Sequence, residues 1–101
     1  MSVIRLTELR REPPLIAIKL EGYLTQETLQ VLNDSLTDYE QAGFHTVQLL
    51  ADGLISADRL ALQAWHQQIS SQLDVQFHTS RLALKHLLEG CHLPVVLNLS
   101  T

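Results

Sequence analysis

The sequence predicts a single α/β domain over residues 1–101, built on a mixed, mostly parallel sheet. Two observations predict this class. Short apolar runs of strand length alternate with segments in which leucines recur every three or four residues, as on one face of a helix. The first two runs follow one another directly, whereas single helical segments separate the later ones. Such crossovers imply parallel pairing, so the expected order is ββαβαβαβ with the first strand antiparallel at an edge.

The first half of the chain carries the clearest predicted helix. Residues 3–7 and 15–20 are expected to be two strands, joined by a turn that contains Pro13 and Pro14. Residues 21–24 are then expected to leave the sheet. Thr25 is placed to cap the next helix, and Gly43 is placed to end it. The predicted buried face of this helix consists of Leu29, Leu32, Leu36 and Tyr39.

The second half contains the junction at which the chain is expected to act. Residues 44–50 are predicted to be a strand, and Ser56 is expected to cap a helix over residues 57–71. A strand at 74–78, a helix capped by Thr79 or Ser80 and ending at Gly90, and a strand at 94–99 follow. Open α/β sheets place their working surface where a strand passes into a helix. We therefore expect the functional site at residues 53–62.

Composition and charge exclude several classes of partner. The net charge is −4 and the seven lysines and arginines are scattered, so the sequence lacks the basic face that binds nucleic acid. No uncharged run approaches the roughly 18 residues of a membrane span, so we expect a cytoplasmic protein without direct membrane insertion. Cys91 is the only cysteine, which fits a reducing compartment and excludes an internal disulfide.

Candidate catalytic and metal-binding residues are present, but their spacing does not favour a catalytic site or a metal site. The histidines lack the spacing of helical or zinc ligands, and no glycine-rich phosphate loop occurs. These histidines are His45, His66, His78, His86 and His92. Cys91 could pair with a neighbouring histidine, but it falls on an apolar helical stripe. Asp52 and Asp58 could act as an acid/base or magnesium pair, although loop and capping roles are favoured. We therefore expect no enzyme activity, no metal and no cofactor.

Three stretches resemble the STAS family, the domain of bacterial anti-sigma factor antagonists and of sulfate transporter tails. LEGYLTQETL (residues 20–29) is similar to the family's passage from a strand into the first helix. VQLLADGL (residues 47–54) resembles its "lvlDlsgv" strand, with Leu50 in place of the aspartate. VQFHTSRLALKHLLE (residues 75–89) resembles its fourth strand and third helix. The resemblance spans about residues 3–97 and implies the STAS fold.

The family's phosphorylation switch is altered in this sequence. Its D-S-S/T-G motif carries the hydroxyl that a partner kinase phosphorylates. With a two-residue gap, residues 56–59 align with the motif and Asp58 takes the acceptor position; the distance to the next strand favours this register. Without a gap, Asp58 aligns with the motif's aspartate and Leu60 with the acceptor. Neither register places a hydroxyl there, so the resemblance implies a switch that is lost, or frozen if Asp58 mimics the phosphorylated form, with Ser56 as the nearest residual hydroxyl.

The resemblance implies a non-enzymatic regulatory module that binds a protein such as an anti-sigma factor or kinase. The expected contacts lie in the loop before the second helix and in its first turns: Leu54, Ile55, Ser56, Asp58, Arg59 and Leu60. The apolar residues around Trp65 exceed one narrow stripe, so part of that surface is expected to face a partner. Three alternatives stay open: an accessory subunit of a lipid or anion transporter, a ligand sensor or enzyme at the junction, and a homodimer.

Overall fold

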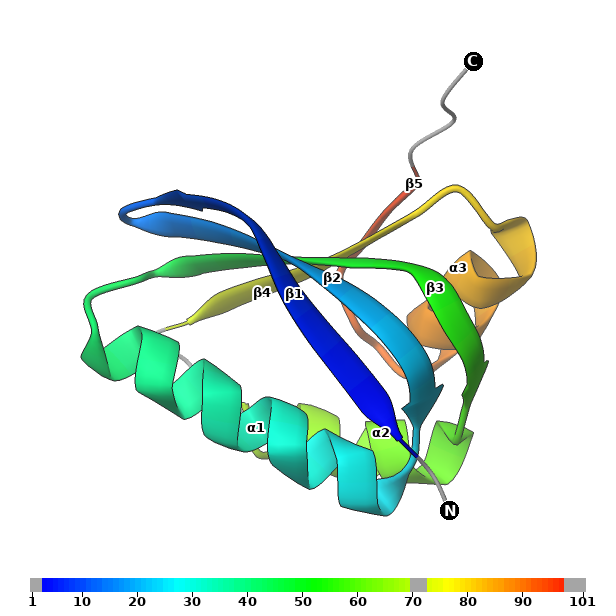
Figure 1. Ribbon diagram of the computed structural model, residues 1–101. Coiled ribbons are helices and arrows are strands. Elements are labelled where there is room, and N and C mark those ends of the chain that lie inside the picture. Colours follow the sequence, from blue (N-terminus) through cyan, green and yellow to red (C-terminus); the bar gives the residue numbers. More distant parts are fainter. Residues whose placement is uncertain (1–2, 70–72, 98–101) are drawn as a thin grey trace.

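The computed structural model describes residues 3–69 and 73–97 and contains the predicted order of elements (Figure 1). Strands β1 (Ile4–Glu12) and β2 (Leu15–Leu24) precede helix α1 (Gln26–Gln41). Strand β3 (Thr46–Ala57) leads into helix α2 (Arg59–His66), and strand β4 (Asp74–Thr79) leads into helix α3 (Leu82–Gly90). Strand β5 (Val95–Leu97) is the last described element. The predicted end of this strand at 98–99 lies outside the described residues, as do positions 70–71 of the predicted second helix.

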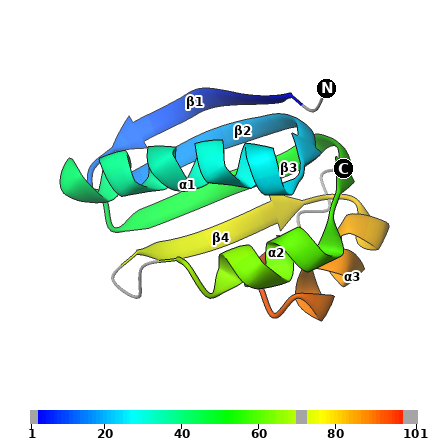
Figure 2. The ribbon, with the colours of Figure 1, turned by 90° about the horizontal axis from the view of Figure 1, so that it is seen from below.

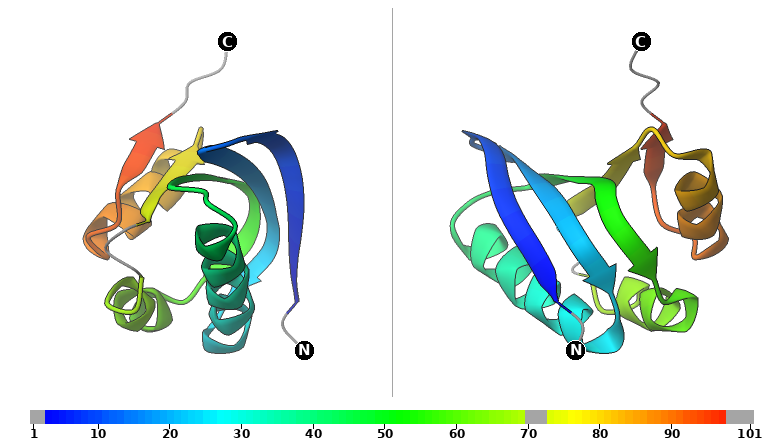
Figure 3. Two further views of the ribbon diagram at one scale, coloured as in Figure 1. Left: turned by 90° about the vertical axis from the view of Figure 1, so that its left-hand side faces the viewer. Right: turned by 45° about the vertical axis from the view of Figure 1, so that its right-hand side comes forward.

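The strands lie in the sheet in their sequence order, β1-β2-β3-β4-β5. β1 pairs with β2 in the antiparallel direction, and all later neighbours are parallel. The predicted mixed sheet with an antiparallel edge strand is therefore confirmed. The sheet arches over α1 and α2, which lie side by side, while α3 lies beside β4 and β5 (Figures 2 and 3).

One hydrophobic core lies between the sheet and the helices. Alternate strand residues are buried on one face, such as Ile16, Ile18 and Leu20 of β2. They join the buried leucines of all three helices in a single cluster. On the other face, Lys19 is exposed and Leu50 and His78 are half-buried. Within the described part of the chain, no helix is long and apolar enough to cross a membrane.

Several predicted boundaries are wrong, the ends of β2 and β3 among them. Residues 21–24 stay in β2, and β3 continues to Ala57 instead of ending at Leu50. Close packing explains why the apolar run of β3 is interrupted at Gly53. A side chain at this position would meet the Glu21 side chain and the Leu20 carbonyl, both at 2.8 Å. Glycine is required for that approach, yet in a sequence it marks a turn.

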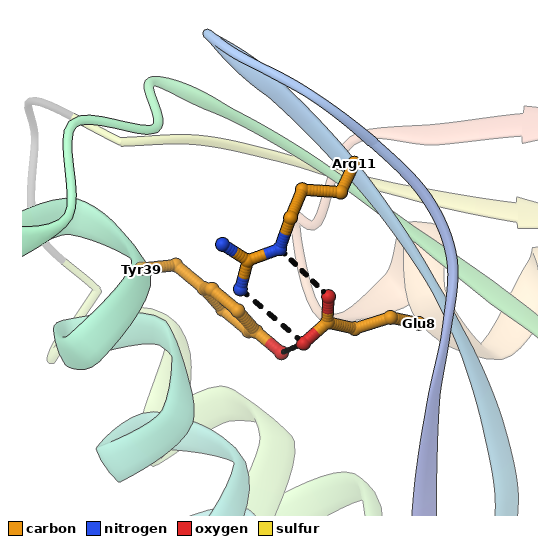
Figure 4. Close-up of polar contacts among 3 residues, drawn as sticks. All are labelled: Glu8, Arg11 and Tyr39. Atoms are coloured by element: carbon orange, nitrogen blue, oxygen red, sulfur yellow. Dashed lines mark hydrogen bonds and ion pairs between the residues drawn. The ribbon is translucent and has the colours of Figure 1, made fainter.

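The edge strand β1 is held to the end of α1 by a small polar cluster (Figure 4). Arg11 Nε donates to Glu8 Oε1 at 2.9 Å, and the Tyr39 hydroxyl donates to Glu8 Oε2 at 3.0 Å. The Arg11 guanidinium also lies 5.1 Å from the centre of the Phe44 ring. The hydrogen bonds from Arg11 and Tyr39 hold the pKa of Glu8 below its ordinary value. Burial, followed by the bond to Glu8, raises the pKa of Tyr39.

Candidate functional site

The candidate site is the carboxyl edge of the sheet, where β2, β3 and β4 pass into the three helices. β3 remains paired with β2 as far as Ala57 opposite Leu24, but its pairing with β4 stops at Leu50 opposite His78. Residues 51–57 of β3 therefore diverge from β4. The sequence placed residues 54–56 in a loop, and the structure instead presents them on a strand with one free side.

Asp52 bridges the gap between the diverging strands. Its carboxylate accepts hydrogen bonds from Thr79 Oγ1 at 2.6 Å, Ser80 N at 2.8 Å and Ser80 Oγ at 2.7 Å. Partial burial acts to raise the pKa of Asp52, but these bonds and the charge of Arg81 outweigh it, and the pKa lies below its ordinary value. Thr79 and Ser80 thus join β4 to β3. The prediction that one of them caps α3 is wrong. The cap position of α3 is Arg81, without a side-chain bond to the helix.

Arg81 occupies the same gap from the α3 side. Its Nη1 donates to the carbonyl oxygen of Leu54, and its backbone N donates to Thr79 Oγ1 at 3.0 Å. A guanidinium thereby satisfies a strand carbonyl that would otherwise face a neighbouring strand. Arg81 was not among the predicted site residues, because no local pattern links it to a carbonyl 27 residues earlier in the chain.

Asp58, rather than Ser56, is the N-cap of α2. Its Oδ1 accepts from Leu60 N at 3.0 Å and Ala61 N at 3.2 Å, and its own N donates to Leu24 O at 2.7 Å. The predicted cap lies two residues too early, because Ser56 is still paired with Tyr23 in the sheet. The carboxylates of Asp52 and Asp58 are thus engaged in separate structural bonds, which does not favour the acid/base pair.

The expected contact residues differ in exposure. Leu54 is only 3% exposed and packs in the core, so its side chain is not on the surface. Ile55 and Leu60 are 65% and 76% exposed, and Ser56, Asp58 and Arg59 are also exposed. Two exposed apolar residues at this edge were missed, Leu82 at the start of α3 and Val3 beside the end of β2. Both residues lie far in sequence from residues 53–62, so no local pattern linked them to the site.

The remaining chemistry-bearing residues do not gather at this edge. No group of three or more histidine, cysteine, aspartate or glutamate side chains in the described ranges is arranged to hold a metal ion. The Cys91 thiol is buried beneath α2, where its Sγ lies 3.7 Å from the backbone oxygen of Arg59. A cysteine in this position serves as a small core residue, as its place on the apolar stripe predicted.

Solved structures of other proteins have a similar fold. The fold is similar to that of an anti-sigma factor antagonist from Mycobacterium paratuberculosis, with a TM-score of 0.65 and 10% identity over 96% of this chain and 88% of that one. It is also similar to the anti-sigma factor antagonist SpoIIAA in its unphosphorylated form, with a TM-score of 0.63 and 12% identity over 95% and 88% of the two chains. No protein-family model and no curated protein matches the sequence. The chain therefore has the fold of these anti-sigma factor antagonists, which is the STAS-like fold that the sequence resemblance implied.

Proposed function

We propose that the chain is a non-enzymatic regulatory module that binds a protein partner through the carboxyl edge of its sheet. The observation that carries the proposal is the exposure of large apolar side chains on three elements that meet there. Ile55 of β3, Leu60 of α2 and Leu82 of α3 are 65%, 76% and 57% exposed. Exposed apolar side chains beside charged ones are typical of surfaces that bind other proteins. Arg59 and Arg81 supply the neighbouring charges.

The start of α2 bears on the phosphorylation switch. The helix begins at Arg59 with Asp58 as its cap, which supports the ungapped register in which Asp58 aligns with the family motif's aspartate. Leu60 then takes the acceptor position. A phosphate would add about −1.5 to −2 charge there, whereas leucine offers an apolar side chain that no kinase modifies. The module is therefore expected to bind its partner without a reversible switch.

Capture of the partner by variants of the full chain tests this proposal. Leu60→Asp places a carboxylate in the first turn of α2, where the helix dipole favours negative charge, so the fold is expected to be kept. The matched control is Leu9→Asp, because Leu9 is 52% exposed and lies toward the opposite end of the sheet, at a bulge of β1. We expect Leu60→Asp to lower recovery of the partner at least about tenfold, as at an interface hot spot, and Leu9→Asp to leave it unchanged.

Mass spectrometry of the captured protein identifies the class of partner. An anti-sigma factor or related kinase supports the proposal, whereas a permease or transport ATPase supports the accessory-subunit alternative. Equal recovery with both aspartate variants would contradict docking through the carboxyl edge. Addition of phosphate to Ser56 by the captured kinase and ATP would contradict the loss of the switch.

A further inference from the structure

A groove of about 430 Å³ lies between α1 and α2 and opens beside the carboxyl edge. Leu29 of α1 and the buried Trp65 of α2 line its apolar part, and the short side chains of Ala61 and Ala64 leave it open. Trp65 is fixed there by an edge-to-face contact with Phe77, with the ring centres 6.1 Å apart. The exposed Leu60 also lines the groove, so the groove adjoins the proposed docking surface.

A smaller hollow of about 70 Å³ lies further along α1, and Gln68 lines both the hollow and the groove. The Glu40 side chain lines this hollow, and its Oε2 atom is buried without a hydrogen-bond partner in the described residues. A buried carboxylate oxygen without a donor lacks the hydrogen bonds that water would give it, so a donor supplied from outside would be bound favourably.

The charges around the groove all have the same sign. The charged residues of α1 are all acidic: Glu27, Asp34, Asp38 and Glu40. Arg59 is the only arginine or lysine of α2, and its guanidinium lies against Gly90 at the end of α3, on the other flank of the helix. No lysine or arginine is among the described residues that line the groove or the hollow.

We propose that this groove binds a basic amphipathic helix of the protein partner. The inference rests on the proposed function and adds the chemistry of the partner. Apolar side chains spaced three and four residues apart would enter the groove against Leu60, Ala61 and Ala64, the usual way in which a helix occupies a groove between helices. A lysine or arginine on the flank of that helix would donate to Glu40. Since α2 spans about 12 Å at 1.5 Å per residue, a partner helix of about three turns would cover the groove.

The test uses two synthetic helical peptides, one of leucine and lysine and one of leucine and glutamate. Each has about 14 residues, because shorter helices are only marginally stable alone. Trp65 is the only tryptophan, so its fluorescence reports directly on the groove. We expect a saturable change with the lysine peptide and at least about tenfold weaker binding of the glutamate peptide. Equal binding of the two peptides, or no saturable change with the lysine peptide, would overturn the inference.

Matched variants locate the binding. Ala64→Arg fills the groove, whereas Ala83→Arg adds the same side chain at an exposed position of α3. Glu40→Gln removes the charge that lines the hollow, whereas Asp38→Asn removes a charge from an exposed position of α1. We expect only the first variant of each pair to weaken binding of the lysine peptide. Equal weakening within a pair would indicate attraction to the net charge and would also overturn the inference.

Two further outcomes identify the occupant of the groove and distinguish the groove from the docking edge. A change in Trp65 fluorescence that grows with protein concentration, without peptide, would identify a second copy of the chain as the occupant and overturn the inference. If the lysine peptide does not bind while Leu60→Asp still abolishes capture of the partner, the inference fails and the proposed function stands. If the peptide binds but Leu60→Asp captures the partner normally, the proposed docking edge fails instead.

Discussion

Substitution of Asp58 distinguishes a helix cap from a charge that a partner recognises. In the structure, Asp58 Oδ1 accepts from Leu60 N at 3.0 Å and Ala61 N at 3.2 Å. Asp58→Ala removes the acceptor for both N–H groups, and the loss of an N-cap lowers the free energy of unfolding by about 1 kcal/mol. For a domain of this size, that loss lowers Tm by roughly 4–8 °C. Asp58→Asn keeps an acceptor oxygen and is expected to stay within a few tenths of a kcal/mol of the unmodified chain.

Thermal unfolding followed by circular dichroism measures this difference, and partner capture with the same two variants measures recognition. We expect Asp58→Asn to melt near the unmodified chain and to capture the partner, because the start of α2 is preserved. An alanine variant with unchanged Tm would refute the cap. An asparagine variant that melts normally but captures nothing would refute the view that Asp58 acts through the helix, and would identify its charge as the recognised feature.

Three further substitutions test the contacts that shape the fold. Because the pKa of Asp52 is lowered in the folded state, its contribution to stability is present above its unfolded pKa and lost as pH falls through the folded value. The free energy of unfolding in urea, measured at pH 7 and pH 3, should therefore fall less with acid in Asp52→Asn than in the unmodified chain. Tyr39→Phe removes the bond to Glu8 and should lower the free energy of unfolding by less than about 1 kcal/mol in urea at neutral pH. Because the pKa of Tyr39 is raised in the folded state, its contribution to stability is present below its unfolded pKa and lost as pH rises through its folded pKa. Tyr39→Phe should lack this loss of stability at high pH. Gly22→Ala, at a φ of 112° and with the Val3 carbonyl in the way, should lower the free energy of unfolding in urea by about 1–3 kcal/mol.

The order of elements could be predicted because it rests on local patterns. Thr25 accepts from Thr28 N, so it caps α1 as expected, and Leu29, Leu32 and Leu36 are buried at the predicted spacing. The second half of β3 could not be predicted from such patterns. Gly53 breaks the apolar run there because β2 approaches closely, and that approach is a property of the folded sheet.

The site could be predicted only in part, because it is assembled across the chain. Residues 53–62 do lie at the carboxyl edge, and Leu60 is exposed as expected. Leu54 is buried because the register with β2 shifts between Leu50 and Gly53, where β3 contains one extra residue, so Leu54 lies on the same face as Ala51. The contribution of Arg81 depends on the gap between β3 and β4, which appears only once the strands diverge.

The divergence of β3 from β4 also explains how the carboxyl edge can carry two surfaces that differ in charge. α2 lies between α1 and α3, and its first residue, Arg59, turns toward the α3 flank, where Arg81 adds positive charge. The α1 flank carries only acidic charge. Because Leu60 stands between the two flanks, a partner anchored on it, as proposed, would meet opposite charges on either side, and these would fix its orientation. Electrostatic complementarity of this kind gives specificity more than affinity, and it would remain after the loss of a phosphorylation switch.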